Sequence, residues 1–236
     1  MESIRVLYRI RHLLAVGLMG IGVCTSLPAS TIFNNSSNDL AIGFNPGASE
    51  VGDEVKLAGT DRYLTSFSFE YFAINTAHPA SFDGTTVTAE VRFYQNTGAL
   101  FHGYPTPNPT SFWDSGPVTL TALTGRSTLV YSAGSDFPVG GLFLPATDMT
   151  WSVHFSGMSG ADSVGVDLYA PPTVGTEVGE FGDYWQNNGG WTLLTNTVPM
   201  DFAAKFDAVP EPSSMVLALC GGLGLLVLAG RLRRKA

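Results

Sequence analysis

Apolar and polar residues alternate with a period of two through most of the middle of this chain. Within residues 63–74 the aromatic side chains Tyr63, Phe67, Phe69 and Tyr71 share one face, and Ser66, Ser68 and Glu70 share the other. The pattern recurs in residues 86–93, 149–155, 164–168 and 202–206, and more weakly in 40–44, 50–57, 118–123, 127–131 and 191–194. Period two places alternate residues on opposite faces of a strand, and no ten-residue stripe of helical period occurs. The sequence therefore predicts an all-β fold, an antiparallel two-sheet β-sandwich of jelly-roll type.

Segments rich in turn-forming residues separate the predicted strands. Pro105, Pro107 and Pro109 block a regular ladder, so a long loop is expected over residues 102–111. A second long loop is expected over residues 171–190, and the polar tract 31–39 is interpreted as a loose lead-in.

The first residues of the chain have the three-part layout of a secretory signal peptide. Arg5, Arg9 and Arg11 precede an apolar stretch over residues 13–23, and small residues follow over 25–30. Cleavage after Ala29 is predicted. A lipoprotein interpretation would use Cys24, but Val23 stands where such sites need Gly or Ala.

The C-terminal residues have the order of a removable membrane anchor. Val209, Pro210, Glu211, Pro212 and Ser213 precede an apolar run over 215–229, which is followed by the basic residues Arg231, Arg233, Arg234 and Lys235. Two prolines so close together favour an extended, accessible backbone. A fifteen-residue apolar run spans about 22 Å as a helix, against a hydrocarbon core of about 30 Å, so a short single transmembrane helix over 214–230 is expected. The alternative, a buried or amphipathic helix, is disfavoured because the run has no polar face.

Basic residues beside membrane segments favour the cytoplasmic side of the membrane. Because such residues flank both end segments, the sequence between them is expected on the periplasmic side of the inner membrane. The predicted divisions are a signal peptide over 1–29, a sandwich body over 30–208, and an anchor over 209–236. Within the anchor, the motif covers 209–213, the transmembrane segment 214–230 and the basic tail 231–236.

This tail resembles the PEP-CTERM sorting signal of exopolysaccharide-producing Gram-negative bacteria, and the resemblance covers only Val209 to Ala236. It implies that Val209, Pro210, Glu211 and Pro212 form the recognition motif, and that the basic cluster stops transfer. It also implies a membrane protease or transpeptidase partner, an exosortase, after export by the general secretion machinery. Such a protein is anchored transiently in the inner membrane and then reaches the cell surface or the extracellular matrix. The resemblance assigns no activity to the body.

Charge and cysteine content narrow the function classes of the body. The chain has 12 Lys+Arg and 20 Asp+Glu; without residues 1–29 and 210–236, 5 cations and 18 acids remain, a net charge of −13 against −8 for the whole chain. We do not expect the body to bind nucleic acid, because contacts to phosphate groups need clustered cations. Both cysteines, Cys24 and Cys220, lie in the end segments, so the body must be held by its own core.

The most suggestive cluster of polar and aromatic residues lies late in the body. Glu177, Glu180 and Asp183 could wrap Ca²⁺, which takes six to eight oxygen ligands, while Tyr184, Trp185 and Trp191 could stack on a sugar ring. The alternative is a solvated acidic loop with aromatic residues at the sandwich edge. Trp113 is a further candidate for an exposed sugar-binding ring, with Trp185 and Trp191.

Signatures of catalysis are weak. His78, His102 and His154 are widely separated, and Glu54, Glu70, Glu90 and Glu180 single out no catalytic pair. The leading hypothesis is a non-catalytic exported protein without a cofactor, and Ca²⁺ is the ion that its acidic loop could bind. The alternative is an exopolysaccharide-binding module, and a carbohydrate-active enzyme is a remote third.

Overall fold

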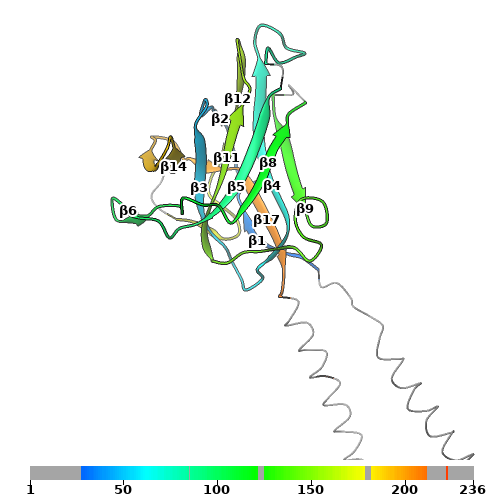
Figure 1. Ribbon diagram of the computed structural model, residues 1–236, viewed down its shortest axis with the longest axis vertical. Helices are drawn as coiled ribbons and strands as arrows, with labels where there is room; N and C mark the ends of the chain where they lie inside the picture. Colours follow the sequence, from blue (N-terminus) through cyan, green and yellow to red (C-terminus); the bar gives the residue numbers. More distant parts are fainter. Residues whose placement is uncertain (1–27, 85, 122–124, 179–181, 212–221, 223–236) are drawn as a thin grey trace, which may run out of the picture.

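The computed structural model describes residues 28–84, 86–121, 125–178, 182–211 and 222. The predicted signal peptide up to residue 27, the anchor from Pro212 onward except Gly222, and the basic cluster lie outside these residues. In the described part of the chain, no helix has both the length and the apolar character needed to cross a membrane. Its named elements are strands, which form two large antiparallel sheets and one small hairpin (Figure 1).

The first sheet contains both ends of the body. Its main path is β1 (Ser30–Asn34), β17 (Ala204–Val209), β4 (Tyr63–Asn75), β12 (Asp162–Tyr169) and β16 (Asp201–Phe202). In addition, β2 (Asp39–Phe44) pairs with β12, while β9 (Ser127–Ser132) and β10 (Leu142–Phe143) pair with β4.

The second sheet follows the path β15 (Trp191–Thr195), β14 (Asp183–Asn187), β3 (Glu50–Lys56), β11 (Asp148–Ser156), β5 (Thr88–Gln95) and β8 (Trp113–Thr119). The two-residue strand β13 (Thr176–Glu177) also pairs with β3, and β6 (Leu100–Phe101) pairs with β7 (Tyr104–Pro105) in a separate hairpin. The ladders of both large sheets are antiparallel, so the prediction of a two-sheet antiparallel β-sandwich is confirmed.

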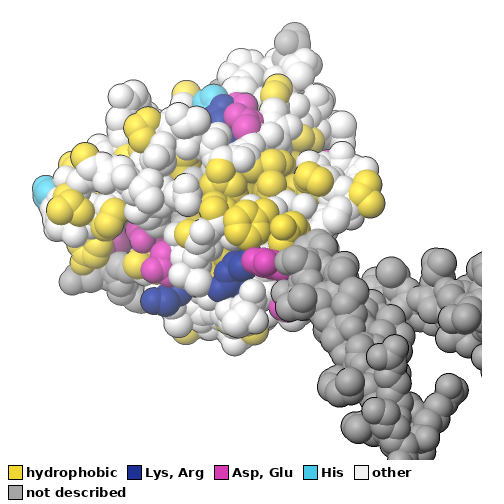
Figure 2. Space-filling model, turned by 60° about the horizontal axis from the view of Figure 1, so that its bottom comes forward, with side chains coloured by type: hydrophobic (Ala, Val, Ile, Leu, Met, Phe, Trp, Pro, Cys, Tyr) yellow, Lys and Arg dark blue, Asp and Glu magenta, His cyan; other side chains and the backbone are white. Residues whose placement is uncertain are grey.

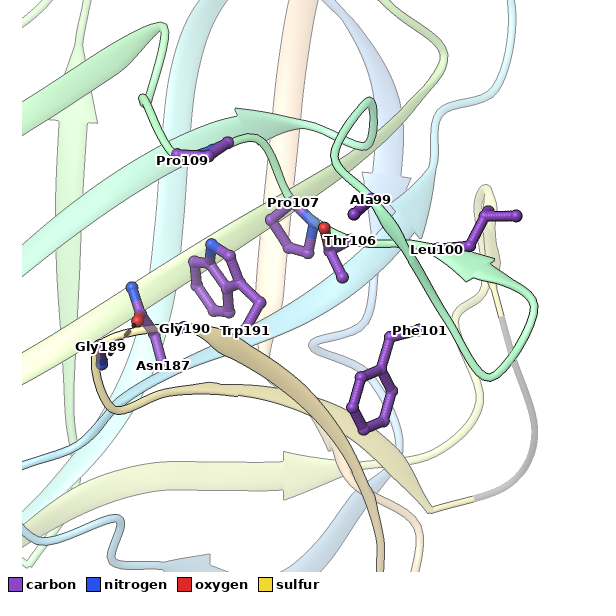
Figure 3. A pocket seen from close by; sticks show the side chains of 10 residues that line it. All are labelled: Ala99, Leu100, Phe101, Thr106, Pro107, Pro109, Asn187, Gly189, Gly190 and Trp191. Carbon is purple, nitrogen blue, oxygen red and sulfur yellow. Dashed lines mark hydrogen bonds between the residues drawn. The ribbon is translucent and has the colours of Figure 1, made fainter.

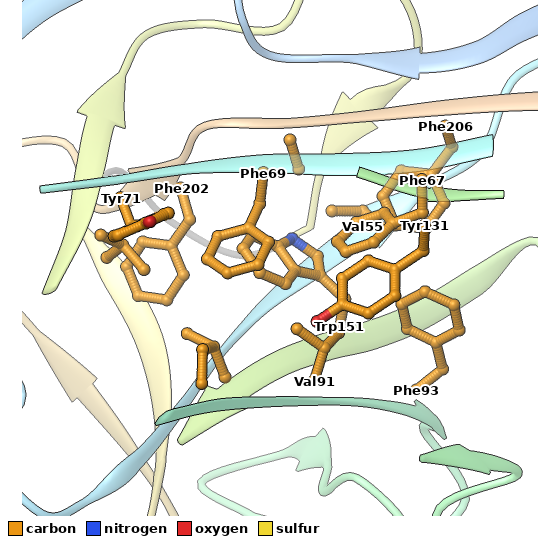
Figure 4. Packing of buried hydrophobic residues seen from close by; sticks show 14 of the residues in the cluster. Val55, Phe67, Phe69, Tyr71, Val91, Phe93, Tyr131, Trp151, Phe202 and Phe206 are labelled. Atoms are coloured by element: carbon orange, nitrogen blue, oxygen red, sulfur yellow. The ribbon is translucent and has the colours of Figure 1, made fainter. Parts of the chain in front are cut away.

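The core lies between the sheets and is rich in aromatic residues (Figure 4). Phe67 of β4 is its centre: its ring centroid lies 4.7–6.2 Å from those of the five rings Phe69, Phe93, Tyr131, Trp151 and Phe206. These side chains come from five strands of both sheets, β4, β5, β9, β11 and β17, and period two points each of them inward. The predicted inward face of residues 63–74 is therefore the face that packs.

Two segments that were predicted to be irregular contain strands in the structure. The tract interpreted as a lead-in contains β1, because Ile32 and Phe33 are buried and the strand pairs with β17. The predicted loop over 171–190 contains β13 and β14, which both pair with β3. These strands are too short for a period to show, and their partners lie far away in the sequence.

The two ends of the body lie side by side. Ser30 pairs with Ala208 in the β1–β17 ladder, and Val209 pairs with Tyr63 in the next ladder. Both strands reach the lower end of the coloured body in Figure 1. Tyr63 contacts Phe143, whose side chain is 47% exposed, with ring centroids 5.5 Å apart. Hydrophobic side chains gather on the face seen in Figure 2.

Candidate functional site

Two of the three tryptophans predicted as exposed sugar-binding rings do not offer a free ring face. Trp185 is 1% exposed, and its indole N–H donates to Glu54 Oε2 at 3.1 Å. Trp113 packs against Phe93 and Phe137, with ring centroids 4.7 and 5.0 Å apart. The prediction of exposure is therefore wrong for Trp185, and Trp113 is half-buried against the core. Period-two alternation does not reveal which outer residues a neighbouring segment covers.

Trp191 lines a pocket of about 530 Å³ (Figure 3). Asn187 at the end of β14, with Gly189 and Gly190 of the following turn, forms one side. Thr106, Pro107 and Pro109 form the other side with residues 99–101. The half-buried indole meets Tyr94 edge-on, with ring centroids 5.1 Å apart. Pro107 and Pro109, which were expected to interrupt a ladder, thus form part of a pocket wall. The prediction of a loop is wrong for Pro105, which pairs with Leu100 in the β6–β7 hairpin.

A polar depression of about 410 Å³ adjoins this pocket and shares Asn187 and Gly189 with it. Its other lining residues are Ala48, Glu50, Glu90, Arg92 and His154. Glu50, Arg92 and His154 alternate along their strands with the core residues Val51, Val91 and Val153, so they lie on the outer face of the second sheet. We call the two depressions together the Trp191 groove.

Hydrogen bonds hold the polar end of the Trp191 groove in place. Glu50 accepts from the Tyr94 hydroxyl at 2.9 Å, from Ser152 Oγ at 2.6 Å and from Asn187 Nδ2 at 3.1 Å. Arg92 Nη1 lies 3.4 Å from the same carboxylate. Burial, and then the neighbouring Glu50, raise the pKa of the Tyr94 hydroxyl, so this group stays a hydrogen-bond donor at neutral pH.

Arg92 joins three carboxylates on the outer face. Besides Glu50, it contacts Glu90 at 2.6 Å and Asp114 at 2.8 Å. Burial acts to raise the pKa of Asp114, but the hydrogen bonds from Arg92 and the Gly116 amide outweigh it and lower that pKa. The groove therefore presents a fixed array of donors and acceptors beside an aromatic ring, as small-molecule and sugar sites do.

The predicted calcium loop is divided in the structure. Asp183 in β14 accepts a hydrogen bond from Thr195 across the hairpin, whereas the Glu177 carboxyl group lies beside Asp53 and Asp201. Glu180 lies outside the described residues. Among the residues that the structure describes, no three His, Cys, Asp or Glu side chains already form a metal-holding group.

Sequence reasoning missed Asp53 and Asp201 as partners of Glu177. A signal existed for Asp53, because it occupies an inward position of β3 between Val51 and Val55. An acidic residue at such a position is costly unless a partner compensates it. No sequence signal pairs Asp53 with Asp201, since that proximity arises only when the two sheets pack.

No protein family, curated protein or solved structure was found to match this chain. The fold and the site define the class of protein: an antiparallel β-sandwich with a groove on the outer face of one sheet.

Proposed function

We propose that this chain is an exported, non-catalytic protein of the cell surface or extracellular matrix. Its PEP-CTERM-like tail is held briefly in the inner membrane and processed there by an exosortase-type partner. The observation that carries this proposal is the order of motif, apolar run and basic cluster in residues 209–236. The position of the motif supports it, because β17 ends at Val209, and Pro210 and Glu211 lie beyond the last ladder.

The folded body is compatible with removal of both end segments. The predicted signal-peptide cleavage after Ala29 falls next to Ser30, the first residue of β1. A cut near Pro210 to Pro212 falls after the last strand, so neither cut removes a core residue. The pairing of β1 with β17 puts both cut sites at one end of the body.

Replacing Glu211 by alanine tests the sorting function. Export across the inner membrane should continue, but release should stop, so a membrane-retained species with an intact tail accumulates. Glu211 is exposed at the end of the described body, so its substitution should leave the core unchanged. Immunoblotting of membrane and medium fractions with a C-terminal tag measures the outcome. The Asp183→Asn variant, which keeps the tail, should be released normally; unchanged release of the Glu211→Ala variant would exclude the motif.

The Trp191 groove favours a second function, binding of a polysaccharide by the body. A half-buried indole beside a fixed set of hydrogen-bonding groups matches the needs of a sugar, which offers apolar ring faces and hydroxyl edges. The bacterial exopolysaccharide is the natural candidate for an exported matrix protein. The carboxylates of Glu50 and Glu90 share one guanidinium group, that of Arg92. This arrangement suits a binding role better than general acid–base catalysis.

Replacing Trp191 by alanine should weaken retention on immobilised exopolysaccharide from the producing strain about tenfold or more, as truncation of a central aromatic contact does. The matched control is Leu100→Ala on the opposite wall, where the 72% exposed side chain should contribute much less. Affinity electrophoresis gives the dissociation constants, and thermal unfolding verifies that both variants are folded. This function would be refuted if the unaltered protein did not bind the polysaccharide, or if the Trp191→Ala variant bound it equally well.

A further inference from the structure

The guanidinium group at the polar end of the Trp191 groove is fully engaged by the protein's own carboxylates. Arg92 is the only lysine or arginine among the described residues that line the groove. Its Nη1 lies 3.4 Å from Glu50, its Nη2 2.6 Å from Glu90 and its Nε 2.8 Å from Asp114. A guanidinium binds an external carboxylate best through two adjacent N–H groups. Because each of the three nitrogen atoms already faces a carboxylate, no such pair remains for an acidic ligand.

Negative charge exceeds positive charge around this end of the groove. Three carboxylates share the one guanidinium, which leaves a net charge of −2 when His154 is counted as neutral. Glu50 is buried, but the side chains of Glu90 and Asp114 are 20% and 40% exposed. A negatively charged ligand in the groove would therefore approach these two carboxylates without a counter-ion. Like charges a few ångströms apart repel, and partial burial limits the screening by salt.

The other basic side chains of the body do not compensate this excess. None of them is among the described residues that line the two depressions; they are Lys56, Arg62, Arg126 and Lys205. Residues 30–209 contain 5 lysines and arginines against 18 acidic residues, so the body as a whole also repels anions. An acidic polymer therefore gains neither a local partner nor a long-range attraction.

The groups that the groove does offer suit uncharged sugar rings. The exposed carboxylate oxygens of Glu90 and Asp114 can accept hydrogen bonds, and the hydroxyl groups of a sugar can donate them, whereas an ionised carboxylate has nothing to donate. The half-buried indole of Trp191 lies across the hairpin from Asn187, which lines both depressions (Figure 3). An aromatic ring there can contact the apolar face of a sugar while the hydroxyl edge meets the carboxylates.

We propose that the Trp191 groove selects polysaccharides of uncharged sugars and rejects acidic ones such as polyuronates. This inference rests on the proposed polysaccharide binding and adds the chemical class of the ligand. Trp191 supplies affinity through the ring face. Glu90 and Asp114 supply selectivity, because they accept hydrogen bonds from hydroxyl groups and repel carboxylates. Arg92 holds these carboxylates in place and is a positioning residue that does not itself bind the ligand's charge.

Two chemical forms of one polymer test this selectivity. Exopolysaccharide from the producing strain is carboxyl-reduced, which makes every uronic acid a neutral hexose, and part of the product is then oxidised at its primary hydroxyl groups to uronic acids. Biolayer interferometry with the exported full-length protein in non-ionic detergent should give about tenfold or more tighter binding of the neutral form at low salt. The difference should shrink in high salt, which screens the repulsion. Equal or tighter binding of the oxidised form would overturn the selectivity and leave polysaccharide binding intact, whereas binding of neither form would refute the binding function itself.

Matched variants locate the selectivity in the groove. Glu90→Gln removes one repelling charge, so the preference for the neutral form, measured as the ratio of the two dissociation constants, should fall about threefold or more. Asp114→Asn, at the more exposed position, should lower the ratio as well and provides a second test if Glu90→Gln folds poorly. Asp61→Asn removes the same charge beside Ser30 of the first sheet and should leave the ratio unchanged. An unchanged ratio in both groove variants, or an equal fall in Asp61→Asn, would show that the groove does not select the ligand's charge.

Discussion

Replacing Phe67 by alanine should destabilise the body by about 3–5 kcal/mol, the usual cost of removing a fully buried aromatic side chain. Phe67 has no exposed surface and contacts five aromatic rings from both sheets. The substitution removes buried apolar area and leaves a cavity that rigid neighbours such as Trp151 cannot fill. Because a domain is stable by only about 5–15 kcal/mol, this is a large fraction of its stability.

Urea unfolding followed by tryptophan fluorescence measures the effect of this substitution. The matched control is Phe143→Ala, which removes the same side chain from a position that is 47% exposed. Its expected cost is about 1 kcal/mol, since surface substitutions outside special features have small effects. Equal costs for the two variants would show that the aromatic cluster is not the centre of stability.

The body should lose stability as the pH rises from about 5 to about 8. Asp53, Glu177 and Asp201 have pKa values raised in the folded state, with Asp201 at about 6. The folded protein therefore holds these protons more tightly than the unfolded chain does. The stabilisation is fully present below the unfolded pKa, near 4, and is lost as the pH rises through the folded values. For Asp201 alone, discounted for partial exposure, the loss is about 1–2 kcal/mol.

Carboxyl groups with lowered pKa values act in another pH range. Asp39 and Asp162, the latter with a pKa of about 2, contribute stability above pH 4 that is lost only on further acidification. They do not oppose the decline between pH 5 and 8. Urea midpoints measured at pH 5 and pH 8 test the prediction, and Glu177→Gln should flatten the profile while Asp183→Asn should not. A midpoint that is constant or higher at pH 8 would contradict it.

The strands with the clearest alternation could be predicted from sequence. Residues 63–74 and 149–155 lie within β4 and β11, since period two survives wherever a strand has one face on the core. The β1 strand was missed because it is short and polar residues follow it. Its assignment depends on pairing with β17, the last strand of the body.

The candidate site was predictable only in part. Trp191 lines the groove, but the prediction of exposed rings failed for Trp185, whose indole is covered and bonded to Glu54. The polar end of the groove was not predicted. Glu50, Arg92 and His154 come from three different strands, and only the ladder register puts them beside one another.

The sequence alone determined the fold class and the chemical character of the two ends, because both follow from local order: alternation along a strand, and motif, apolar run and basic residues along a tail. Only the tertiary structure decided which side chains meet. Asp53 and Phe202 are 149 residues apart in the sequence yet share a hydrogen bond. The packing of the two sheets brings their strands together. The buried acidic cluster and the Trp191 groove both depend on that packing.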